Sequence, residues 1–154
     1  MKLSLLFKVL PLFLLLGCSA SQTVSNDIKM EIKTRKMESW VNLMPGSKQS
    51  FFISGELIIE SKESAFLDSV HLLKCEISQQ SKLLYELHPD FQIVNINMDL
   101  VNADGRLVFI NLSSGVPIKK ELNLEKSISM EIYLTAINKV YHHRIDSVNV
   151  AKAY

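Results

Sequence analysis

Alternation of apolar and polar residues with a period of two is the dominant pattern of this sequence. Ile28, Met30 and Ile32 alternate with charged neighbours, and Phe51 and Ile53 begin a longer run of the same kind. Successive side chains of a β-strand point to opposite faces, so this pattern predicts strands with one face buried. The strands are predicted within 28–33, 51–60, 70–77, 82–87, 91–98, 107–110, 130–135 and 140–150. No segment shows a strong helical period, so the sequence predicts an all-β chain.

The predicted strands number about eight and are separated by turn signals at intervals of roughly ten residues. Turns are predicted at Pro89-Asp90, at 102–105 and near Asn138-Lys139, and a loop at 113–117. One helical turn is expected within 60–69, and little other helix. The strand count and size resemble those of immunoglobulin-like or fibronectin-like domains, although the Cys–Trp–Cys spacing of true immunoglobulin domains is absent. We therefore expect a single antiparallel β-sandwich over residues 27–154.

The N-terminal residues have the composition of an export signal. Lys2 supplies a positive start, and the uninterrupted apolar run 9–16 is shorter than the roughly 20 residues that span a bilayer as a helix. A short apolar stretch between a basic start and small residues is typical of a cleaved signal peptide. We expect residues 1–17 to be removed.

The end of this segment, Leu15-Leu16-Gly17-Cys18, resembles the lipobox of bacterial lipoprotein precursors. The resemblance implies cleavage after Gly17 and acyl chains, such as palmitate, on Cys18, which together would hold the chain at a membrane. Residues 18–26 are small and polar, as expected of a tether. Ser19 is compatible with the outer membrane, facing the periplasm, in a Gram-negative host. In other hosts the resemblance implies the outer face of the cytoplasmic membrane.

Charge and cysteine content exclude some classes of partner. Of the 17 basic residues, Lys2 and Lys8 lie in the signal segment, which leaves 15 basic and 16 acidic side chains. A nearly neutral chain offers no electrostatic basis for binding nucleic acid. With Cys18 lipidated, Cys75 is the one remaining thiol, so no intramolecular disulfide is expected, and its position in a strand predicts a small buried hydrophobe.

The most distinctive stretch is 40–46, which contains Trp40, Met44, Pro45 and Gly46. Pro45-Gly46 suits the central positions of a type II turn, because proline fixes φ and glycine accepts a positive φ. We expect Trp40 to plug one end of the core. The alternative is a ligand groove or interaction surface formed around these four residues.

Metal chemistry receives little support from the histidines and methionines. His142 and His143 are adjacent, so on a strand they point to opposite faces. The methionines are scattered singly, as core-filling residues are. If a Cu(I)-type site existed, the best candidates would be Met44 with His71 or His88. We expect no metal and no cofactor.

Motifs of catalysis are also absent: the sequence has no G-x-S-x-G, H-E-x-x-H or glycine-rich phosphate loop. No catalytic residue and no small-molecule substrate can be named, so we do not expect an enzyme. The sequence indicates an envelope lipoprotein whose domain is a non-catalytic binding or scaffolding module for another envelope protein. The segments 27–36 and 82–87 could recruit such a partner by strand addition if either lies at a sheet edge. The alternatives are an accessory lipoprotein of a secretion or envelope-assembly machine, and a metal-handling protein.

Overall fold

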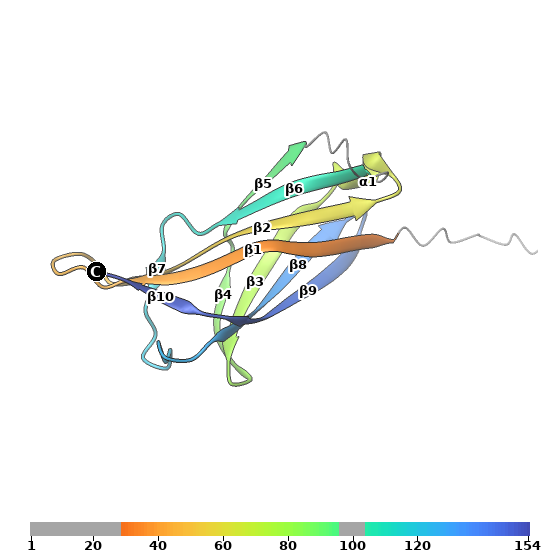
Figure 1. The fold of residues 1–154 in the computed structure, drawn as a ribbon. Helices are drawn as coiled ribbons and strands as arrows, with labels where there is room; N and C mark the ends of the chain where they lie inside the picture. The colour runs from red at the N-terminus through yellow and green to blue at the C-terminus, as the bar shows by residue number, and fades with distance from the viewer. Residues whose placement is uncertain (1–28, 96–103) are drawn as a thin grey trace, which may run out of the picture.

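The computed structural model describes residues 29–95 and 104–154, which form ten strands and one helical turn (Figure 1). The strands are β1 (Met30–Asn42), β2 (Ser50–Ser61), β3 (His71–Gln79), β4 (Lys82–Leu87), β5 (Asp90–Asn95), β6 (Asp104–Asn111), β7 (Val116–Pro117), β8 (Ile128–Ala136), β9 (Lys139–Val148) and β10 (Val150–Ala153). The helical turn α1 (Ser64–Leu67) lies within the segment where one turn was predicted. The chain is therefore all-β, as the alternation predicts.

The strands form two sheets. The first sheet has the order β10-β1-β2-β6-β5, with β7 added beside β2, and the second has the order β4-β3-β8-β9. Apolar side chains of both sheets meet in one core, where Phe51 of β2 stacks on Tyr85 of β4 with ring centroids 5.1 Å apart. Burial of this apolar surface, worth about 25 cal/mol per Å², is the main force that holds the two sheets together.

The predicted inward faces of the central strands are confirmed. Every second residue of β2 from Phe51 to Ile59 is buried, and so is every second residue of β8 from Ile128 to Ala136. Strand β3 differs at its start, because its register against β8 shifts between Leu72 and Lys74. This bulge turns Leu73 outward, where it is 47% exposed, and Leu72 packs on the core instead.

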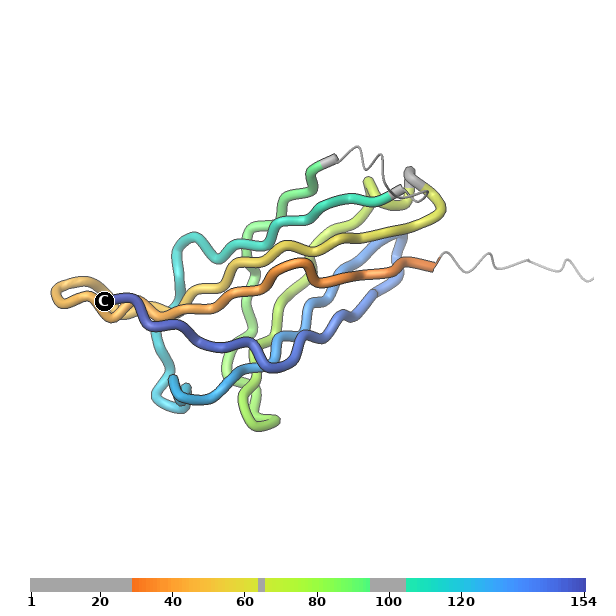
Figure 2. The backbone as a smooth tube through the Cα atoms, in the orientation of Figure 1, coloured from red at the N-terminus to blue at the C-terminus, as the bar shows by residue number. Residues whose placement is uncertain are grey.

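Two features of the topology differ from the prediction. Ten strands are present among the described residues instead of about eight, because Val116-Pro117 pairs with β2 and the last run divides into β9 and β10. The pairing is also not wholly antiparallel, since β10 runs parallel to β1. The chain crosses from the second sheet to the first between Val148, which pairs with Ile128 of β8, and Val150, which pairs with Ser39 of β1 (Figure 2). Ser147, whose φ is 61°, lies in a bulge of β9 directly before this crossing.

Cys75 is a free thiol and is only 1% exposed, which confirms the prediction of a buried position. Burial raises the pKa of this thiol to about 12, and the nearby Glu76 charge acts in the same direction. The thiolate, which is the reactive form, is therefore scarce at neutral pH.

Gln79 is one of the few polar side chains buried in the described part of the chain. Its amide nitrogen donates to the carbonyl oxygens of Asn123 and Lys126, both at 2.9 Å, and its amide oxygen accepts from the Asn123 backbone N–H at 2.9 Å. These bonds fasten the loop before β8 to the end of β3 and satisfy backbone groups that would otherwise be unpaired.

Replacing this amide tests its role. We expect Gln79→Leu to lower the free energy of unfolding by roughly 2–4 kcal/mol, because it leaves backbone groups of the loop unsatisfied. Urea denaturation of the domain measures the change. The matched control is Gln92→Leu, the same substitution at an exposed position of β5, which should change stability by less than about 0.5 kcal/mol. Equal effects of the two substitutions would contradict this role.

Candidate functional site

One edge of the first sheet is only partly paired. Strand β1 pairs with β2 along its whole length, whereas on its other side β10 pairs only with Ser39–Asn42. Among the described strands, none pairs with this side of β1 from Met30 to Glu38. Both candidate segments for strand addition lie at a sheet edge: the described part of 27–36 from Met30 onward lies at this partly paired edge, and 82–87 is β4, the outer strand of the second sheet.

A groove of about 680 Å³ lies beside this edge, between the two sheets. It is lined by residues 34–40 of β1 and by residues 145–149 and 151, where the chain crosses from β9 to β10. Next to the groove, Thr34 Oγ1 and His143 Nε2 are 2.8 Å apart and join the edges of the two sheets. Burial lowers the pKa of His143, and the neighbouring His142 acts in the same direction, so the neutral imidazole is favoured at neutral pH.

Apolar side chains and paired charges line this groove. Met37 and Ile145 are partly buried and pack against the core. Met37 lies directly over Gly55 of β2, where a Cβ would collide with its thioether. The charges are internally compensated, because Lys36 pairs with Glu38 at 2.9 Å and Arg35 with Glu56 at 3.5 Å. The groove therefore offers backbone hydrogen-bonding groups and an apolar lining rather than a net charge.

The residues of the distinctive stretch are divided between two places. Trp40 belongs to β1, stacks on Phe52 with ring centroids 5.4 Å apart, and borders the groove. Pro45 and Gly46 form the predicted turn, in which Ser47 N–H donates to the Met44 carbonyl and Gly46 has φ = 80°. The expected core position of Trp40 is wrong, because β1 alternates and its buried residues are the flanking Ser39 and Val41. The sequence alone does not fix which face of β1 is inward.

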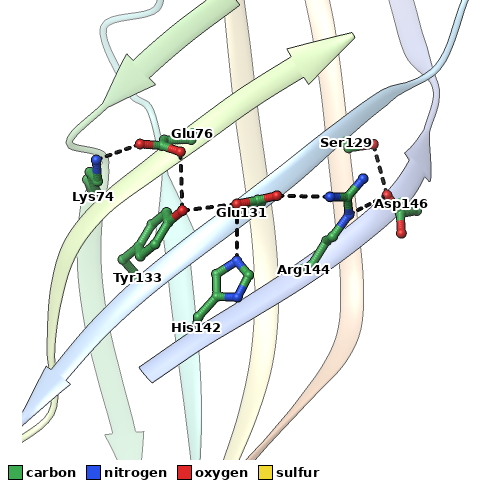
Figure 3. Close-up of polar contacts among 8 residues, drawn as sticks. All are labelled: Lys74, Glu76, Ser129, Glu131, Tyr133, His142, Arg144 and Asp146. Carbon is green, nitrogen blue, oxygen red and sulfur yellow. Dashed lines mark hydrogen bonds and ion pairs between the residues drawn. The ribbon is translucent and has the colours of Figure 1, made fainter. Parts of the chain in front are cut away.

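A second polar arrangement, the outer-face network, crosses the second sheet (Figure 3). It consists of Lys74, Glu76, Ser129, Glu131, Tyr133, His142, Arg144 and Asp146. Its centre is a pair of like charges, since Glu76 of β3 lies directly opposite Glu131 of β8. Such a cross-strand pair is destabilising unless other groups compensate for it.

Three side chains compensate for this repulsion. Lys74 donates to Glu76 at 2.5 Å, and Arg144 donates to Glu131 at 3.0 Å. The Tyr133 hydroxyl lies between the two carboxylates, 3.2 Å from Glu76 and 3.0 Å from Glu131. The hydrogen bond to Glu131 is the largest cause that raises the pKa of Tyr133 to about 12. The phenol therefore stays protonated, and its single proton serves two acceptors.

General-acid catalysis by a carboxyl group would need one that holds a proton near neutral pH. The network has the opposite effect: the hydrogen bond from Tyr133, with those from His142 and the nearby positive charges, lowers the pKa of Glu131. Hydrogen bonding from Lys74 likewise lowers the pKa of Glu86, the next carboxylate along the row. These carboxylates are ionised and act in surface ion pairing. The sequence did not indicate the network, because strand register decides which polar residues become neighbours.

The remaining predicted site residues do not converge. Met44 precedes β2 and His71 follows it, so these two residues lie at opposite ends of a strand about 40 Å long. His88 Nδ1 is 3.0 Å from the Leu73 carbonyl oxygen. His142 and His143 point to opposite faces, toward Glu131 and Thr34. Within residues 29–95 and 104–154, no group of three or more His, Cys, Asp or Glu side chains could hold a metal ion. Cys18 lies outside the described residues.

Comparison with known proteins found no relative of this chain. No known family, no curated protein and no solved structure matches this chain. In the described ranges, no helix has the length and apolar character needed to cross a membrane.

The outer-face network, together with Glu86, which binds Lys74 at its edge, makes stability depend on pH. The pKa values of Glu86 and Glu131 are below their ordinary value of 4.5, and that of Asp146 is below 3.8. At acid pH the folded state therefore binds fewer protons than the unfolded state. The contribution of these carboxylates to the free energy of unfolding is fully present above pH 4.5 and decreases as the pH falls below it. We expect Glu131→Gln to make the fall in urea midpoint between pH 5 and pH 3 less steep.

The control for this experiment is Glu121→Gln, which removes a carboxylate that lies 3.9 Å from Lys82, outside the network. This variant should retain the steep fall between pH 5 and pH 3. A Glu131→Gln protein as sensitive to acid as the parent chain would show that the network does not couple protonation to folding.

Proposed function

We propose that this chain is a membrane-anchored lipoprotein of the cell envelope, whose domain binds an extended segment of another envelope protein. The domain is a non-catalytic module, and we propose an immunoglobulin-like β-sandwich as its fold class. Lipidation at Cys18 is supported by the sequence Leu15-Leu16-Gly17-Cys18 after a short apolar stretch. In a Gram-negative host, Ser19 favours the outer membrane, with the domain facing the periplasm.

The edge of β1 along Met30–Glu38, with which no described strand pairs, is the observation that carries the binding role. Unpaired backbone N–H and C=O groups along a strand edge are a template for another strand. Strand β10 already uses the same edge at Ser39–Asn42, so a guest strand along Met30–Glu38 would continue the sheet in line with it. Alternate side chains of the guest would then face the groove, whose lining includes Met37 and Ile145. We therefore propose an extended segment with alternating apolar residues as the occupant.

The anchor is tested by substitution of each cysteine. We expect Cys18→Ala to abolish incorporation of labelled palmitate and to leave the uncleaved precursor, because the acceptor thiol is gone. Cys75→Ala is the matched control and should be labelled and processed like the parent chain, since Cys75 is buried in the core. Labelling of Cys18→Ala at the parental level would refute lipidation at this residue.

Strand addition is tested in two steps. A photo-crosslinking residue in place of Lys36 is expected to give a discrete adduct in cells, while one in place of Lys48, an exposed residue of the distant β1–β2 loop, should give none. Addition of the captured segment as a peptide should then slow hydrogen exchange of amides within Met30–Glu38 at least tenfold.

If the peptide slowed hydrogen exchange elsewhere in the domain and left the exchange of amides 30–38 unchanged, the partner would bind another surface. Equal adducts at positions 36 and 48 would contradict binding along the groove.

A further inference from the structure

The turn between β8 and β9 lies at the end of the domain from which the tether leaves. Strand β1 begins at Met30, which pairs with Ser61 at the end of β2. After α1, the chain enters β3 at His71, which pairs with Thr135 near the end of β8. The Ile137-Asn138 turn follows directly, and Figure 1 shows the β8–β9 tip and the start of β1 at the same end of the molecule.

This turn presents large apolar side chains to solvent. Ile137 is 58% exposed and Val140 is 61% exposed, the two highest values among the large apolar residues of the described strands and turns apart from the C-terminal Tyr154. Leu73, turned outward by the bulge in β3, adds a third exposed apolar side chain near this end of the second sheet. We name Ile137 and Val140 the apolar tip.

The backbone conformation at Ile137 is unusual for an isoleucine. Its φ is 44°, in the left-handed region where a β-branched residue is strained and where glycine or asparagine is the ordinary choice. The next residue, Asn138, has φ = 61° and conforms to that preference. An exposed isoleucine at the strained position stabilises neither the turn nor the core, so an apolar contact outside the chain is the physical reason that we assign to it.

We propose that the apolar tip contacts the surface of the lipid bilayer to which the chain is anchored. The proposal rests on the lipid anchor at Cys18. Eleven residue steps separate the anchor Cys18 from Lys29, the first described residue, and fully extended they reach about 36–40 Å. A tether of this length keeps the nearer end of the domain at high local concentration against the bilayer, so a weak contact of two side chains is sufficient.

Apolar contact, rather than net charge, would hold this end of the domain at the bilayer. Exposed Lys29, Lys62 and Lys139 lie here together with the exposed acids Glu31 and Glu63. Because both signs are present, we expect the contact to form on neutral phosphatidylcholine and to persist at high salt.

The test uses the chain from Cys18 onward, coupled through the Cys18 thiol to a maleimide phospholipid in phosphatidylcholine vesicles that contain brominated acyl chains. Cys75 does not compete, because it is buried. Tryptophan is introduced by Ile137→Trp at the tip or by Ser47→Trp in the loop at the opposite end. We expect the added fluorescence of Ile137→Trp to be quenched by bromine at least threefold more than that of Ser47→Trp, at low and at high salt.

Equal quenching of the two reporters, or none at position 137, would overturn the proposal. The Ser47→Trp chain has the same tether and the same extra tryptophan, so it controls for the affinity of tryptophan itself for lipid. Because the lipid is attached chemically, this outcome does not depend on lipidation in the cell, which the palmitate experiment tests separately.

Discussion

The crossing of the chain from one sheet to the other at Asn149 is the constraint on which the rest of the structure depends. A single run of residues pairs first with β8, up to Val148, and then with β1, from Val150 onward. One side of the domain is thereby held together by a continuous chain. Because the crossing reaches β1 only at Ser39, it also leaves the first nine residues of β1 without a neighbour on that side among the described strands. The groove is the space between the crossing and this unpaired edge.

The proposed binding surface and the apolar tip occupy different parts of the molecule, so one does not obstruct the other. The groove lies along β1 and the crossing, whereas the tip belongs to the β8–β9 turn. Under both proposals, the turn would rest on the lipid while the edge of β1 faces sideways into the surrounding space. The outer-face network covers a different surface, the exposed side of the second sheet, where opposite charges are paired.

Much of the fold follows from the sequence, because the period of two is a local property. The inward faces of β2 and β8 and the bounds of β4 could be predicted from alternation and turn residues. The bulge at Leu73 could not, since a bulge depends on the register against β8. Strand β7 is two residues long, too short to show any period. The free edge of β1 and the pair Glu76 and Glu131 required knowledge of which strands are neighbours, and the predicted position of Trp40 failed because burial of a residue depends on that same arrangement.

Strand β1 links the two proposed attachments of this protein, and its pairing determines how the domain would bear force. Its twelve pairing positions with β2 run from Met30↔Ser61 to Asn42↔Ser50, parallel to the direction in which the tether would pull. Tension along this strand would load these hydrogen bonds together, in shear, rather than one after another. A partner strand bound along the same edge would pull on β1 itself. Load would then pass from partner to membrane through a single strand, and the hydrophobic core would carry little of it.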